Sequence, residues 1–151
     1  HAAGVMLNEA VLVFPARSGS GKSTLARQFE AMAAGVILSD DRIVVRGDDR
    51  GFSAFGTPWL GEARLSAHAG GALKALIFLK HAAEEGLRQV PRDEALTRLL
   101  PVVSIPWYEP AVMGRVLDVV ERMVMDIPAY ELGFTPTVRA AEFLIRTMDR
   151  L

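Results

Sequence analysis

The feature that most restricts the fold of this sequence is a change of pattern across residues 16–23, which read ARSGSGKS. The preceding residues 10–14 are all apolar, which is typical of a buried strand. After the glycines, Leu25, Phe29 and Met32 recur at the spacing of one helix face. The sequence therefore predicts a strand, a glycine-rich loop and a helix in direct succession.

Hydrophobic patterns along the rest of the chain predict further strands and helices. The expected strands are residues 5–7, 10–14, 36–38, 43–45, 52–55, 73–79 and 130–134, and the expected helices follow Ser23 and cover residues 91–100, 110–125 and the segment after Pro136. Asn8-Glu9 and residues 47–51 are typical hairpin turns, whereas glycine and proline predict an irregular segment at residues 56–64. Together these elements predict one α/β domain over residues 1–151, built on a mixed sheet.

The composition excludes several kinds of protein. The 17 basic and 18 acidic residues leave no positive surplus for nucleic acid or an anionic membrane. No apolar run approaches the roughly 18 residues that span a bilayer. The absence of cysteine excludes disulfides and thiolate metal sites, and it fits a reducing, cytoplasmic location.

The glycine-rich loop fits the phosphate-loop pattern, with Ala16 in place of the usual first glycine. Successive backbone N–H groups of such a loop turn towards an anion, and the positive end of the next helix points at it. We expect Lys22 to reach the β- and γ-phosphates, Ser23 to bind magnesium and Thr24 to lie near the α-phosphate. The expected nucleotide is Mg-ATP. The residues expected to bind it are Gly19, Ser20, Gly21, Lys22, Ser23 and Thr24.

Two acidic residues, Asp40 and Asp41, follow the predicted strand at residues 36–38. A carboxylate at a strand end beside the phosphate loop can hold magnesium, and a second can accept a hydroxyl proton. Neighbouring strand residues point to opposite faces, so both carboxylates serve one site only if the backbone bends there. The alternative is that one aspartate acts and the other caps a turn.

The first third of the chain resembles the catalytic domain of bacterial HPr kinase/phosphorylase, whose phosphate-loop fold is related to phosphoenolpyruvate carboxykinase. The resemblance lies in residues 1–4 (HAAG), the hairpin after them, residues 18–23 (SGSGKS) and residues 38–42 (LSDDR). The later residues 56–59 (GTPW) are similar to an uncharacterised HPr-kinase-like branch.

This resemblance implies roles for several residues. Lys22 and Ser23 hold phosphate and magnesium, with Lys22 acting in catalysis, while Asp41 is a metal ligand and Asp40 is the base that deprotonates a serine. His1 matches a histidine near the family's active site, and Glu62 and Arg64 correspond to its Glu-x-Arg segment. The family also implies a homo-oligomer.

The expected function is transfer of the ATP γ-phosphoryl group to a hydroxyl, such as a serine of a protein or peptide. The glycine-rich segment that follows Glu-x-Arg in the true enzyme is absent, which leaves the acceptor open. A non-catalytic Mg-ATP-binding regulatory module and a small-metabolite kinase remain as alternatives. The aromatic residues Trp59, Trp107 and Tyr108 are expected to pack at the edge of the core.

Overall fold

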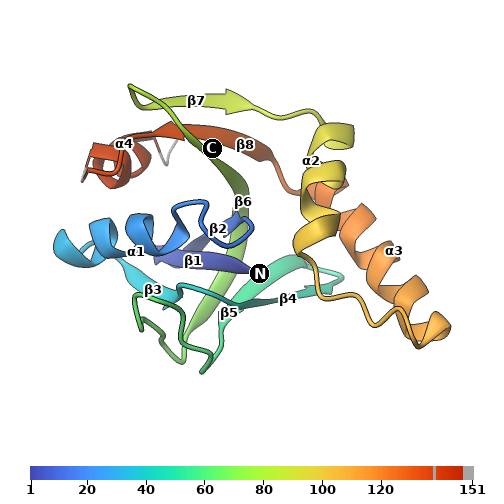
Figure 1. Cartoon of the computed structure of the whole chain (residues 1–151). Coiled ribbons are helices and arrows are strands. Elements are labelled where there is room, and N and C mark those ends of the chain that lie inside the picture. Colours follow the sequence, from blue (N-terminus) through green and yellow to red (C-terminus); the bar gives the residue numbers. More distant parts are fainter. Residues whose placement is uncertain (138, 148–151) are drawn as a thin grey trace.

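The computed structural model describes residues 1–137 and 139–147 (Figure 1). Its elements are, in order, β1 (Ala2–Leu7), β2 (Ala10–Pro15), α1 (Lys22–Ala31), β3 (Val36–Ser39), β4 (Ile43–Asp48), β5 (Gly51–Gly56), β6 (Gly70–His81), β7 (Gly86–Gln89), α2 (Arg92–Leu99), the 3-10 turn η1 (Leu100–Val102), α3 (Pro110–Asp126), β8 (Ala129–Phe134) and α4 (Arg139–Thr147). The predicted α/β class is confirmed.

The strands form one mixed sheet, as the sequence predicts. Six strands lie in the order β3-β1-β2-β6-β5-β4, and β8 pairs with β6 and β7. The pairs β2–β6 and β6–β8 are parallel, and the remaining pairs are antiparallel. Strand β6 joins the two parts of the sheet, because its first half pairs with β2 and β5 and its second half pairs with β8.

The β1–β2 hairpin has the tight turn that the sequence predicts. Asn8 and Glu9 have φ values of 48° and 67°, so both turn residues are left-handed. Left-handed conformation at both positions matches the twist of two-residue hairpins. The hairpin places β2 in the interior of the sheet, between β1 and β6.

Strand β2 has buried side chains on both of its faces. Val11 and Val13 belong to a hydrophobic cluster with α2 and α3, whereas Leu12 and Phe14 belong to a second cluster with α1 and α4. This division follows from the alternation of side chains along a strand. Helices therefore cover both faces of the sheet, with α1 and α4 on one side and α2 and α3 on the other (Figure 1).

Two details differ from the sequence-based expectations. Strand β7 was not predicted, and it pairs with β8 at the edge of the sheet. The expectation that Trp59, Trp107 and Tyr108 pack against the core is wrong, because their side chains are 60%, 79% and 79% exposed. Among the described residues, no helix is both long and apolar enough to cross a membrane.

Candidate functional site

The glycine-rich loop connects β2 to α1, as predicted. Gly19 and Gly21 have φ values of 79° and 93°, which side-chain-bearing residues rarely adopt. A Cβ on Gly21 would lie 2.4 Å from Cζ of Phe134, so the loop lies directly against β8. The two glycines thus provide the backbone conformation and the close approach that this loop requires.

The first turn of α1 carries unsatisfied backbone donors. In the described part of the chain, no group accepts a hydrogen bond from the N–H groups of Gly21, Lys22, Ser23 or Thr24. The first turn also contains no acidic side chain. Free N–H groups and the positive end of the helix dipole make such a helix start favourable for an anion.

Lys22 lies under the loop with its side chain buried. Its Nζ donates to the carbonyl oxygens of Ala16 (3.0 Å) and Arg17 (2.8 Å), which closes the loop. Burial lowers the pKa of Lys22 below that of a free lysine, although Asp41, and more weakly Glu62 and Asp40, act in the opposite direction. A phosphate that binds here would stabilise the buried ammonium, because it supplies a charged partner and hydrogen-bond acceptors in place of the water lost on burial.

Asp40 is a buried carboxylate, only 1% exposed, that accepts four hydrogen bonds. Three come from the backbone N–H groups of Gly61 (2.9 Å), Ala63 (2.7 Å) and Leu65 (3.4 Å) in the irregular segment before β6. The fourth comes from the Ser23 hydroxyl, at 3.2 Å. Asp40 therefore ties the irregular segment to the start of α1.

The backbone bends directly after β3. A bend here is what the sequence requires if Asp40 and Asp41 are to share one site. The Ser39 hydroxyl accepts hydrogen bonds from the N–H groups of Asp41 and Arg42, both at 3.1 Å. This turn directs Asp40 into the interior, whereas Asp41 remains partly exposed. Both carboxylates act electrostatically on Lys22, but they have different partners.

Asp41 lies against the His1 imidazole, whose Nε2 is 2.9 Å from Oδ1 of Asp41. Arg42 lies on the other carboxylate oxygen, with its Nε at 3.5 Å. The backbone nitrogen of His1 donates to the carbonyl of Val102 at 2.6 Å, which fixes this end of β1 against η1. Spacing in the sequence gives no signal for a pair 40 positions apart, whereas the family resemblance implies a histidine near the site at the position of His1.

Glu62 and Arg64 lie on the irregular segment that Asp40 holds. The carbonyl of Glu62 accepts a hydrogen bond from Arg27 of α1 at 3.1 Å, and Glu62 shares a hollow with Ser23 and Thr24. Arg64 is exposed and has a φ of 58°. Glu62 is therefore close to the predicted nucleotide-binding residues.

The described residues contain no group of three or more histidine or acidic side chains gathered at metal-binding distance. This does not conflict with magnesium, which usually binds through one or two protein ligands, substrate phosphates and water. Ser23 and the nearby carboxylates Asp40 and Asp41 are the groups that fit such a site, since they offer oxygen ligands beside the free N–H groups.

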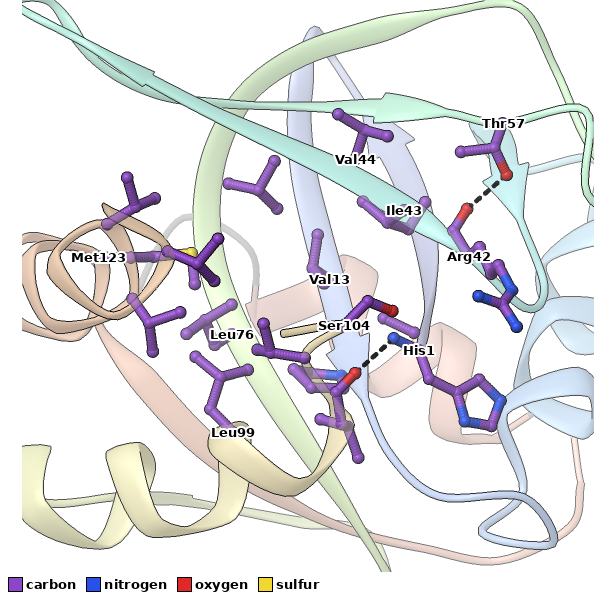
Figure 2. A pocket seen from close by; sticks show the side chains of 18 of the residues that line it. His1, Val13, Arg42, Ile43, Val44, Thr57, Leu76, Leu99, Ser104 and Met123 are labelled. Atoms are coloured by element: carbon purple, nitrogen blue, oxygen red, sulfur yellow. Dashed lines mark hydrogen bonds between the residues drawn. The ribbon is translucent and has the colours of Figure 1, made fainter. Parts of the chain in front are cut away.

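A cavity of about 650 Å³ lies beside this site, between the sheet and α3 (Figure 2). No pattern in the sequence predicts this cavity. Val112, Val116, Val120 and Met123 recur at helical spacing on one apolar face of α3, and all four line the cavity. His1 and Arg42 also line it, so the cavity reaches the Asp41 pair.

No protein-family model, curated protein or solved structure matches the chain.

Proposed function

We propose that this chain is a phosphate-loop phosphotransferase of the HPr kinase-like type, which moves the γ-phosphoryl group of Mg-ATP to a hydroxyl. The observation that carries the proposal is the row of free N–H groups from Gly21 to Thr24, with the buried Lys22 ammonium beside them. Anions bind favourably at such helix starts, and phosphoryl transfer depends mainly on positioning and charge neutralisation. A serine of a protein or peptide is the proposed acceptor.

Asp40 is proposed to position Ser23 for magnesium. The Ser23 hydroxyl donates its proton to Asp40, so the lone pairs of its oxygen remain available to a metal ion. A carboxylate offers about four acceptor positions, and four donors already occupy those of Asp40. Taking up a substrate proton would therefore require Asp40 to give up one of these hydrogen bonds.

Asp41 is proposed as the base. It is partly exposed, and its partner His1 lines the cavity from which an acceptor would approach. In the proposed reaction the acceptor oxygen forms a bond to the γ-phosphorus, the bond to the β,γ-bridging oxygen breaks, and the hydroxyl proton passes to Asp41. ADP leaves with the bond's electron pair, neutralised by magnesium and Lys22. The proposal therefore differs from the family resemblance, which makes Asp40 the base and Asp41 a metal ligand.

Calorimetric titration with Mg-ATP, combined with detection of phosphorylated acceptors in a lysate by mass spectrometry, tests the proposal. The unmodified chain is expected to bind Mg-ATP and phosphorylate an acceptor, Lys22→Ala to do neither, and Asp41→Asn to bind without transfer. Unchanged Mg-ATP affinity in Lys22→Ala would refute the phosphate site. Binding without transfer by the unmodified chain would instead support the regulatory module.

A further inference from the structure

The cavity beside the site has a mostly apolar lining, and His1 and Arg42 lie together at one end of it. Figure 2 shows His1 and Arg42 at one end, whereas Leu76, Leu99 and Met123 lie at the other. Apolar cavities with a few polar groups at one end are typical of sites that hold an apolar body and orient one reactive group. The polar end is the end that adjoins Asp41.

One wall of this cavity is formed by β4, an edge strand of the sheet. Strand β4 ends the strand order and, among the described strands, pairs only with β5. Its residues Ile43, Val44 and Val45 line the cavity, and Val44 is 52% exposed. An unpaired edge presents N–H and C=O groups that can pair with another extended chain.

Two exposed aromatic side chains lie on the segment that leads into α3. Trp107 and Tyr108 lie in the segment between the cavity-lining residues Ser104 and Val112. Their rings pack edge to face, with centroids 6.4 Å apart, and both are 79% exposed. Exposed aromatic residues are enriched on surfaces that bind a partner.

We infer that the acceptor is an extended peptide segment that adds to the free edge of β4. Alternate side chains of the segment are apolar and enter the cavity, and its serine lies at the end formed by His1 and Arg42. A pleated strand sends every second side chain to the same face, so two residues span about 6.6 Å of the cavity wall. The inference rests on the proposed function, because it names the acceptor class of that site.

The unpaired edge favours a peptide over a lipid or an apolar alcohol. An aliphatic molecule would fill the cavity but would make no hydrogen bonds to the outer edge of β4, whose other edge pairs with β5. A peptide satisfies both the apolar lining and the strand edge.

Labelled synthetic peptides test the inference by fluorescence anisotropy, with no nucleotide present. The probes carry a serine at one end, followed by valine alternating with lysine, and each is made with the serine at either terminus. Two further versions carry N-methyl groups on alternate amides. The first version is methylated at the odd-numbered residues and the second at the even-numbered residues, and these are called the two phases. Because a strand pairs with an edge through every second residue, one phase is expected to lose at least about tenfold in affinity and the other to stay within about twofold. Equal effects of both phases would overturn strand addition.

A matched pair of variants tests the cavity. Val119 and Leu117 lie on α3 and are 38% and 37% exposed, but Val119 lines the cavity and Leu117 does not. Val119→Asp is expected to weaken peptide binding at least about fivefold, and Leu117→Asp to leave it unchanged, since a carboxylate in an apolar cavity loses solvation. Equal effects of the two variants would overturn the inference.

Two outcomes separate this inference from the proposed function. If the peptides bind in the expected pattern but Mg-ATP does not bind, the phosphotransferase proposal fails while strand addition stands. If Mg-ATP binds and the peptides do not, or if octanol is phosphorylated as well as the peptides are, the acceptor class is wrong.

Discussion

Replacing Asp40 by asparagine should destabilise the protein far more than the same change at Asp41. An asparagine side chain has one acceptor oxygen and one NH₂ group. Whichever way the amide is turned, its NH₂ group takes the place of one Asp40 oxygen and faces the donors that this oxygen binds in the unmodified protein. One orientation loses the N–H of Ala63 at 2.7 Å and the Ser23 hydroxyl, and the other loses the N–H groups of Gly61 and Leu65. A buried donor left without its partner costs about 1–3 kcal/mol, so we expect a loss of about 2–3 kcal/mol for Asp40→Asn.

The matched change Asp41→Asn disturbs only a partly exposed ion pair. Such pairs contribute about 0–1 kcal/mol, which leaves a difference of about 2 kcal/mol between the two variants. For a chain of this length, that difference corresponds to about 4–8 °C in Tm. Urea denaturation and thermal unfolding of both variants measure it. Equal stability of the two variants would refute the view that Asp40 holds the irregular segment against α1.

Three further results are expected at the phosphate loop and at Asp41. Gly21→Ala should lose both stability and Mg-ATP binding. In thermal unfolding its loss of stability should exceed that of Gly19→Ala by at least about 1 kcal/mol, because both glycines are left-handed but only Gly21 faces the Phe134 ring. Asp41→Asn should retain Mg-ATP affinity within about threefold in calorimetry but lower the rate of transfer by about 100-fold or more, the usual range for loss of a general base; an unchanged rate would remove Asp41 from the chemistry. Because burial lowers the pKa of Lys22, the unfolded chain binds more protons than the folded chain at pH values between that lowered pKa and 10.5. The free energy of unfolding, measured with urea, should therefore rise with pH in this window relative to Lys22→Met, and a flat difference would contradict the assigned burial.

Most of the elements could be predicted because their residues repeat with a regular period. The apolar run of β2 and the helical spacing of α1 bracket the loop, and the turn at Asn8 and Glu9 fixes the first hairpin. Strand β7 carries no such signal, because it is short and mostly exposed, and only its pairing with β8 defines it.

The candidate site was predicted less completely, because its contacts join distant parts of the chain. The resemblance and the loop pattern predict roles for Lys22, Ser23, Asp40 and Asp41, but no periodicity links Asp40 to the N–H groups of an irregular segment more than 20 residues away. The cavity was missed for a similar reason. The apolar stripe of α3 predicts burial equally well whether the helix meets a filled core or lines a space.

The central claim is that the N–H groups at the start of α1 hold the phosphates of Mg-ATP. Amide chemical shifts of isotope-labelled protein, followed during titration with Mg-ATP, test it most directly. The largest changes are expected at Gly19, Gly21, Lys22, Ser23 and Thr24, and Lys22→Ala should abolish them. If these amides stay unchanged at saturating Mg-ATP, or if the changes cluster elsewhere, the claim is wrong.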